Sequence, residues 1–233
     1  MTAEEINSKL EITYAAVDLY QEDKFTISNL VDKTGKTASE LYSLFPNKKA
    51  ILRFYYTGLI YQYRAMITEI SDFDNYTVSE KLSNFIYTTF DMMNENRAFV
   101  EATFDEYVFR KNNAQFKEET AELFEEFISE DPEVAVSAAF FIGDFFYSFL
   151  AKEYLHILKF WTKDSSEGYE RSMALTDKLT GFVEELIYNK IVDKGFDLAK
   201  YLVNHAGLGK NIPFVGDCIS DLFKENKERE AHD

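Results

Sequence analysis

The chain has few of the residues on which disulfide-stabilised and metal-binding proteins depend. Its 233 residues include one cysteine and three histidines. Cys218 alone cannot form an intramolecular disulfide, and no basic and apolar leader precedes the first expected helix, so we expect a protein of the reducing cytoplasm. His156, His205 and His232 lack metal-ligand spacing, and the cysteine has no obvious base. We therefore expect no metal, no cofactor and no catalytic site, and so no enzyme.

Proline, glycine and long apolar runs are also scarce. Three prolines and nine glycines leave long uninterrupted stretches, in which apolar residues mostly recur three and four positions apart. This periodicity predicts an all-α protein. The longest apolar run, Ala138 to Leu150, is interrupted by Asp144 and is shorter than the ~20 residues that a membrane span requires. We expect no membrane partner.

Positive charge is in deficit. The chain has 25 lysines and arginines against 41 acids, a formal net charge of −16. Residues 1–50 contain six lysines, no arginine and eight acids, which gives this segment a charge of −2. Because phosphate contacts dominate affinity for nucleic acids, a basic surface is the usual signature of their partners. Only a local arrangement of cations can therefore support DNA binding here.

The first 49 residues nevertheless have the pattern of a helix-turn-helix. Ile12, Ala16 and Leu19 recur at helical spacing and predict a long first helix. A short helix over 29–33 follows, and Gly35 stands where a helix end needs a residue that tolerates positive φ.

The next helix begins with a capping signal. Thr37 and Glu40 have capping-box spacing, in which the hydroxyl accepts from the Glu40 amide while the carboxylate accepts from the Thr37 amide. Leu41, Leu44 and Phe45 then face the core. A longer helix followed by two short ones across a glycine turn is the arrangement of a helix-turn-helix DNA reader.

These residues resemble the tetracycline-repressor (TetR) family of bacterial one-component regulators. The resemblance covers roughly the first 55 residues and rests on Ala15-Ala16, Leu19-Tyr20, Phe25-Thr26-Ile27, Gly35, Leu41-Tyr42, Phe45 and the segment from Lys48 to Leu52. It implies an N-terminal DNA-binding domain, a C-terminal helical domain that binds a small molecule, and a homodimer.

The resemblance also implies which positions meet an operator duplex. Nearest the bases would be Lys36, Thr37, Ala38 and Ser39, and nearest the phosphates Thr26, Ser28, Tyr42 and Lys48, with Lys49 as a further DNA-binding residue. Lys36, Ser39 and Glu40 depart from the family pattern, and a carboxylate at position 40 would repel a phosphate unless it caps its own helix. Tyr42 has a second interpretation, as an aromatic packed beneath the recognition helix.

The DNA interpretation depends on Lys36, Lys48 and Lys49 sharing a surface that carboxylates do not hem in. Lysines in the first turn of a helix oppose its macrodipole by roughly 0.3–1 kcal/mol, so Lys48 and Lys49 are unfavourable there unless an anion lies nearby. A phosphate would be such an anion. The alternative is that exposed lysines tolerate this penalty in water.

The remaining pattern predicts a larger helical bundle joined to the N-terminal part by one long helix. The expected helices cover about 48–70, 78–94, 97–111, 114–129, 132–162 and 167–193, and two short extra helices fall within about 195–228. In the last long helix the residues that should face inward are Met173, Leu179, Phe182, Val183, Leu186, Ile187 and Ile191.

Residues 138–150 carry apolar side chains around most of the helix circumference, so this helix must be covered on more than one side. A second copy across a two-fold axis can supply one of those sides, and burial at the centre of one monomer is the alternative. The residues predicted to form the dimer contact are Phe146, Phe149, Leu150, Phe182 and Leu186.

Aromatic residues make up 16% of the chain, and many fall between positions 85 and 161. They would suit a small lipophilic or aromatic effector, although aromatic stripes also form ordinary cores. The candidate wall residues are Phe85, Phe90, Met93, Phe104, Tyr107, Phe141, Phe145 and Trp161, with Tyr107 or His156 as a polar anchor.

The sequence thus predicts a helix-turn-helix DNA-binding domain over residues 1–48 and a helical ligand-binding and dimerisation domain over residues 49–233. The predicted function is that of a ligand-responsive transcriptional regulator, a repressor that binds double-stranded DNA as a homodimer. The alternative is a protein of the same fold that has lost DNA binding and binds a lipid, an isoprenoid or a protein partner.

Overall fold

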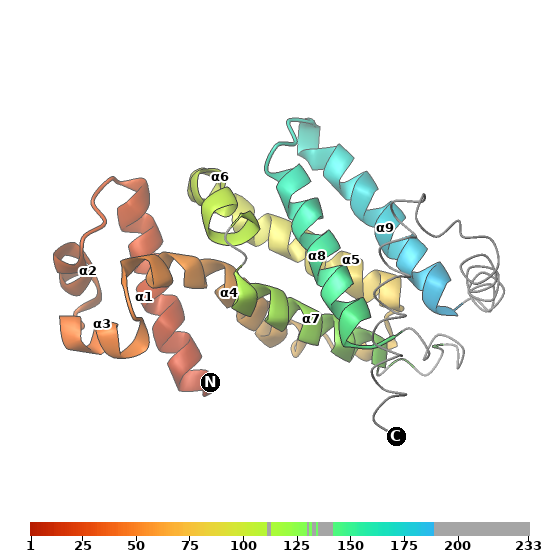
Figure 1. Ribbon diagram of the computed structural model, residues 1–233, viewed down its shortest axis with the longest axis horizontal. Helices are drawn as coiled ribbons and strands as arrows, with labels where there is room; N and C mark the ends of the chain where they lie inside the picture. The colour runs from red at the N-terminus through yellow and green to blue at the C-terminus, as the bar shows by residue number, and fades with distance from the viewer. Residues whose placement is uncertain (111–112, 130, 132–133, 135–141, 189–233) are drawn as a thin grey trace, which may run out of the picture.

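The computed structural model describes residues 1–188 except 111–112, 130, 132–133 and 135–141, and the structural statements below concern this part of the chain. All regular elements in it are helices, which confirms the all-α prediction (Figure 1). The short helices expected within 195–228, and Phe140, Phe141 and Ile191, lie outside the described residues.

Residues 1–48 form what we call the N-terminal unit, built from α1 (Ala3–Gln21), α2 (Ile27–Thr34) and α3 (Ala38–Leu44). Each helix begins at a threonine whose side chain accepts from the backbone amide three positions on. Gly35 ends α2 with a left-handed backbone (φ 68°), as its position predicted. The side chains buried inside the unit include Ile12, Ala16, Leu30, Leu41 and Phe45.

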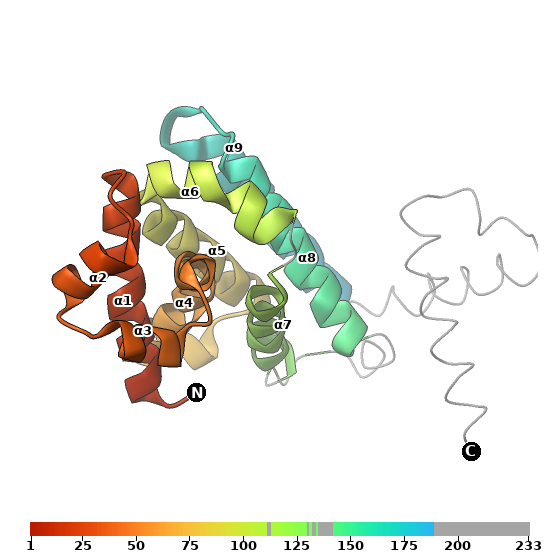
Figure 2. The same cartoon turned by 60° about the vertical axis from the view of Figure 1, so that its left-hand side comes forward.

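Helix α4 (Lys48–Ile67) joins the N-terminal unit to the rest of the molecule. It packs against α1 on one side and against α7 on another (Figure 2). The Thr13 hydroxyl donates to the Ile51 carbonyl (3.2 Å), and a Cβ added to Gly58 would lie 2.7 Å from a Leu10 methyl. Because α1 and α4 approach this closely, α4 packs as part of the N-terminal unit as well as part of the rest of the molecule.

The C-terminal bundle surrounds α4 and carries the remaining elements. These are α5 (Val78–Asn94), α6 (Arg97–Phe104), a π-helical turn (Asp105–Phe109), α7 (Ala114–Ser129), α8 (Asp144–Trp161) and α9 (Glu170–Tyr188), with short 3₁₀ turns at Phe73–Asn75 and Glu167–Tyr169. Helix α7 packs along α8, and α9 packs along α5 and α8.

Aromatic rings fill the centre of the bundle. Tyr154 of α8 is fully buried, and its ring centroid lies 4.9 Å from that of Phe85 and 6.1 Å from that of Phe124. Its hydroxyl donates to Thr89 Oγ1 (3.0 Å), so the one polar atom of this ring is satisfied. Burial raises the pKa of Tyr154 above its ordinary range, and the ring stays neutral.

Several predicted helix ends were wrong. The helix expected over 132–162 is not continuous, because Gly143 is extended (φ −174°) and stands as the N-cap of α8, which begins at Asp144. The helix expected from 167 begins at Glu170, after Gly168 adopts a left-handed conformation (φ 57°). The helix expected over 97–111 changes to a π-helical turn at Asp105. In addition, α4 ends at Ile67 rather than near residue 70.

Two side chains of α9 also differ from the prediction. Met173 and Phe182 were expected to face inward, but they are 41% and 57% exposed. The stripe that α9 buries is largely polar and consists of Ser172, Thr176, Thr180 and Ile187. Leu179, Val183 and Leu186 are partly buried against the core and Ile187 is buried, so the periodicity placed four of the six described residues correctly. None of the described helices combines the length and apolar character that crossing a membrane requires.

Candidate functional site

The capping box predicted at the start of α3 is confirmed. Glu40 Oε2 accepts from both the Thr37 amide and the Thr37 hydroxyl (2.7 Å each), and the Glu40 amide donates to Thr37 Oγ1 (3.2 Å). The hydrogen bonds from the Thr37 amide and then from its hydroxyl hold the pKa of Glu40 below its ordinary value. The carboxylate is folded against its own helix, as the sequence suggested.

One face of α3 is exposed, while Leu41 on the other face and Phe45 just beyond the helix are buried. Tyr42 is 50% exposed, so the interpretation of this ring as packed beneath the helix was wrong. The exposed positions of this segment are Thr37, Ala38, Ser39, Glu40, Tyr42 and Ser43. They include Thr37, Ala38, Ser39 and Tyr42 from the predicted DNA contacts.

Two further predicted phosphate contacts lie at the start of α2. The Thr26 hydroxyl accepts from the Asn29 amide (3.1 Å), and both Thr26 and Ser28 are exposed. A helix N-terminus directs unpaired amides and the positive end of its dipole outward, which suits an anion.

The three lysines do not present a surface clear of carboxylates, and that expectation was wrong. Lys36 Nζ lies 3.1 Å from a carboxylate oxygen of Glu11, and Lys49 Nζ lies 3.1 Å from one of Glu106. Lys48 Nζ instead donates to the Phe25 carbonyl (2.8 Å) and lies 4.7 Å from the centre of its ring.

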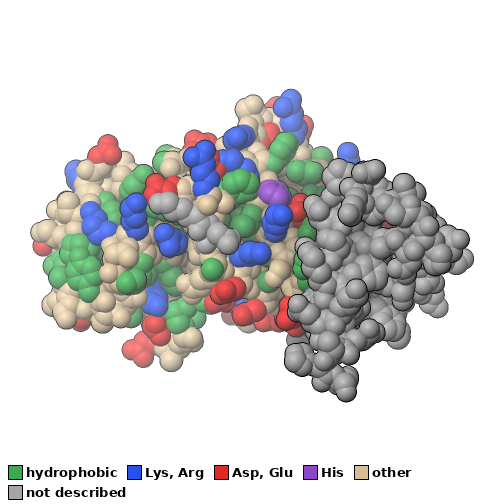
Figure 3. All heavy atoms as spheres, in the orientation of Figure 1, with side chains coloured by type: hydrophobic (Ala, Val, Ile, Leu, Met, Phe, Trp, Pro, Cys, Tyr) green, Lys and Arg blue, Asp and Glu red, His purple; other side chains and the backbone are tan. Residues whose placement is uncertain are grey.

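The two ion pairs join segments far apart in the sequence, so no local pattern indicated them. Surface pairs of this kind contribute roughly 0–1 kcal/mol, so an incoming phosphate can displace such a carboxylate at small cost. Figure 3 shows that lysine and arginine side chains are spread over the visible face from the N-terminal unit into the bundle, in spite of the chain's acidic balance.

A cleft of about 500 Å³ lies where the N-terminal unit meets the bundle. We call it the junction cleft. It is lined from α1, the α1–α2 connection, the start of α4 and the π-helical turn by Tyr20, Asp23, Phe25, Lys48, Lys49, Leu52 and Tyr107.

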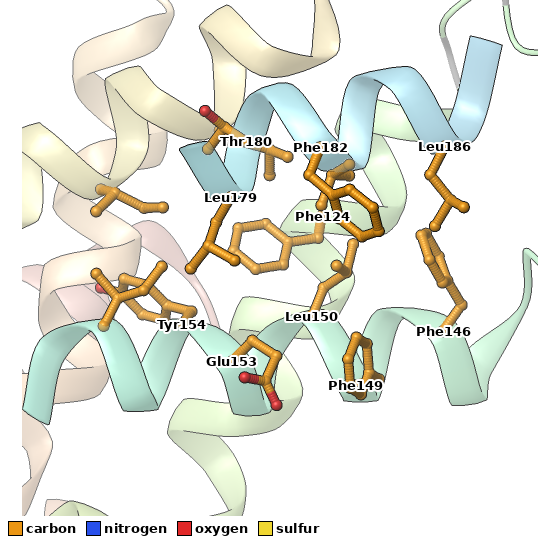
Figure 4. A pocket seen from close by; sticks show the side chains of 14 residues that line it. Phe124, Phe146, Phe149, Leu150, Glu153, Tyr154, Leu179, Thr180, Phe182 and Leu186 are labelled. Atoms are coloured by element: carbon orange, nitrogen blue, oxygen red, sulfur yellow. The ribbon is translucent and has the colours of Figure 1, made fainter. Parts of the chain in front are cut away.

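A second, apolar pocket of about 120 Å³ lies between α8 and α9, with side chains of α5 and α7 behind them. Figure 4 shows Phe146 of α8 and Leu186 of α9 pointing toward each other across it. All five residues predicted for the dimer contact line it, namely Phe146, Phe149, Leu150, Phe182 and Leu186. We call it the α8–α9 pocket.

The predicted effector wall does not line this pocket. Of its eight residues, Phe141 lies outside the described part and Tyr107 lines the junction cleft instead. Trp161 is fully buried between the Phe90 ring, stacked at 5.4 Å, and the Arg97 guanidinium at 4.2 Å. The core residues Phe85, Phe90, Met93 and Phe104 are buried, and Phe145 is partly buried, while His156 is exposed beside Glu153.

Sequence reasoning missed the residues that line the α8–α9 pocket from α5 and α7. Leu82, Ile86 and Phe124 have ordinary core spacing, and nothing in their local sequence distinguishes a pocket wall from a filled core. The described residues contain no group of three histidine, cysteine or acidic side chains positioned to hold a metal ion.

The comparison with curated proteins returns no match. A family model described as a tetracyclin repressor-like C-terminal domain matches residues 81–202, which is more than half of the chain. The match covers the bundle, whereas the resemblance noted in the sequence covers the N-terminal unit, so two separate parts of the chain point to the same family. The chain belongs to the tetracycline repressor-like family of regulators.

Proposed function

We propose that the chain is a ligand-responsive transcriptional repressor that binds double-stranded DNA as a homodimer in the cytoplasm. DNA binding is assigned to residues 1–48, and ligand binding and dimerisation to residues 49–233. The observation that carries the proposal is the exposed face of α3, which Leu41 and Phe45 anchor to the interior while Glu40 is withdrawn into the capping box.

The exposed groups of α3 are short and polar, which fits close approach to base edges. Thr37, Ala38 and Ser39 would meet the bases, while Tyr42 would donate its hydroxyl to a backbone phosphate. The recognition helix has no arginine, so bidentate recognition of guanine would fall to Lys36 once a phosphate or base displaces Glu11. We expect modest sequence specificity.

Dimerisation is assigned to the outer face of α8 and α9. Phe182 of α9 is 57% exposed there and lines the α8–α9 pocket together with Phe149 and Leu150 of α8, and a large exposed apolar side chain beside an apolar pocket marks an interaction surface. An isologous contact through this face would place two copies of α3 on successive major grooves, roughly 34 Å apart.

The α8–α9 pocket is the proposed effector site. Its volume of about 120 Å³ is below the roughly 300–1,000 Å³ of typical small-molecule sites, so a larger lipophilic effector has to separate α8 from α9 to enter. Such a movement would change the dimer contact, because residues that line the α8–α9 pocket also form that contact.

A route from α8 to the N-terminal unit passes through the π-helical turn. Asp105 forms an ion pair with Lys159 of α8, and the next residue, Glu106, pairs with Lys49 in the first turn of α4. Lys48 in turn holds the carbonyl that precedes α2. Displacement of α8 would thus shift α2 and α3.

A titration of the full chain against genomic DNA fragments at several salt concentrations tests DNA binding. A regulator gives a steep linear fall of log affinity with log salt, and Lys48→Ala should reduce that slope by about one per protomer because each protomer loses one phosphate contact. Lys163→Ala, an exposed lysine at the α8–α9 turn, is the matched control and should leave the slope unchanged.

The acidic character of the N-terminal unit and the paired lysines favour a second candidate, a family member that has lost DNA binding and binds a lipid, an isoprenoid or a protein partner. If the chain does not bind DNA even at low salt, only this second candidate remains. If Lys48→Ala leaves the salt slope unchanged, Lys48 does not contact a phosphate.

A further inference from the structure

The junction cleft is lined by a hydrogen-bond donor that the described part of the protein does not use. Tyr107 is only 7% exposed and lines the cleft, yet its hydroxyl bonds to no other described residue. Arg53 follows Lys49 by one turn of α4 and does not itself line the cleft, but its Nε atom is buried without a hydrogen-bond partner among the described residues. A hydroxyl on a side chain as deeply buried as Tyr107 is usually paired, so an unpaired one that lines a cleft points to an acceptor that binds there.

The charges around Tyr107 indicate that this acceptor is negatively charged. Burial raises the pKa of Tyr107, with Glu106 and Tyr20 adding to the rise, while the positive charges of Lys49 and Arg53 lower it, so these groups lie close enough to act on the hydroxyl. Lys48 and Lys49 line the same cleft from the first turn of α4, where the helix dipole favours an anion. Two lysines and a tyrosine hydroxyl therefore line the same cleft.

The volume and the lining residues of the cleft indicate a ligand larger than a bare ion. Its volume of about 500 Å³ lies within the range of small-molecule sites, and the rings of Tyr20, Phe25 and Tyr107 form much of its wall. Asp23 also lines it, and a carboxylate there suits a ligand that carries a donor such as a hydroxyl group.

We propose that the junction cleft binds a phosphate group, carried by a small molecule with a flat ring, through Lys48, Lys49 and the Tyr107 hydroxyl. This site is separate from the α8–α9 pocket proposed for the effector. A phosphate bound there competes with Glu106 for Lys49 and so weakens the link between the π-helical turn and α4. Phosphate chemistry has two sources, a free phosphorylated compound and the backbone of DNA.

Calorimetric titration of the full-length chain with phenyl phosphate tests the proposal without any DNA. We expect saturable binding, tighter than that of inorganic phosphate because the ring contacts the aromatic wall. Lys49→Gln and Tyr107→Phe should each weaken it about fivefold, the size of one net hydrogen bond. Lys24→Gln, a lysine of the α1–α2 connection that pairs with Glu22 and does not line the cleft, should have no effect.

A 12-base-pair duplex added as competitor distinguishes the two sources. No competition assigns the site to a free phosphorylated compound. Competition, with duplex binding also weakened by Tyr107→Phe, assigns it to the DNA backbone and overturns the small-molecule part of the proposal. Absence of saturable phenyl phosphate binding, or wild-type binding by both variants when their circular dichroism is native, overturns the site itself. Because the first titration contains no DNA, its result stands whether or not the chain binds an operator.

Discussion

Asp164 shows how much a single side chain contributes to the connection between α8 and α9. It is 7% exposed, and its two carboxylate oxygens accept from the amides and hydroxyls of Ser166 and Ser172 at 2.6–2.9 Å. Burial alone would raise the pKa of Asp164, but these four hydrogen bonds outweigh it and hold the pKa far below its ordinary value. The carboxylate therefore fixes the start of α9 to the end of α8.

We expect Asp164→Asn to lower the free energy of unfolding at pH 7 by about 1–3 kcal/mol, because the amide cannot accept all four bonds. A folded-state pKa below the unfolded value means that the charge contributes stability above the unfolded pKa of about 3.9 and loses it as the pH falls further. The difference between wild type and variant in urea unfolding should accordingly shrink below about pH 4. Asp74→Asn, at an exposed position, is the control. A difference that persists unchanged at pH 3 would contradict this account.

At the scale of elements, the turn between α2 and α3 depends on one backbone conformation. Gly35 has φ 68°, and the Gly35 amide donates to the Val31 carbonyl (2.9 Å). A Cβ added to Gly35 would meet no described atom within 4 Å, so steric crowding does not select glycine there. The left-handed backbone does, because it costs other L-residues roughly 1–2 kcal/mol.

Gly35→Ala should therefore destabilise the chain by about 1 kcal/mol and weaken DNA binding by misplacing α3. Gly35→Asn should cost less than alanine, since asparagine tolerates the left-handed region. Thermal unfolding of the three proteins checks the order. Equal stability of the alanine and asparagine variants would show that backbone strain is not the cause.

The elements also show what the sequence could and could not predict. The caps at Thr37 and Gly35 were predictable because each depends on residues within four positions. The Lys36–Glu11 and Lys49–Glu106 pairs were not, because they depend on how α1, α4 and the π-helical turn cross. For the same reason the apolar periodicity of α9 could not reveal that Ser172, Thr176 and Thr180 are also buried. Whether a helix forms and how it is capped thus depend on local sequence, whereas pockets and long-range ion pairs depend on how the helices pack.

At the scale of the whole molecule, the bundle leaves an apolar surface that its own described helices do not cover. Phe182 is the most exposed large hydrophobic residue in the described part, and it borders the α8–α9 pocket. Leu179, Val183 and Leu186 of α9 are partly buried against the core, whereas Phe182 faces outward beside them. A second copy of the chain that covers Phe182 would complete the burial of this part of the helix.

We expect Phe182→Glu to convert a homodimer into a monomer, because a charge would have to be buried in an apolar contact at a cost of several kcal/mol. Analytical ultracentrifugation at several protein concentrations measures the change. Met66→Glu is the control, since Met66 of α4 is 49% exposed and does not line the α8–α9 pocket. If the wild type is dimeric and Phe182→Glu remains dimeric to the same degree, the contact lies elsewhere on the molecule. A monomeric variant that also binds DNA with a smaller salt slope would connect the dimer contact to the spacing of the two recognition helices.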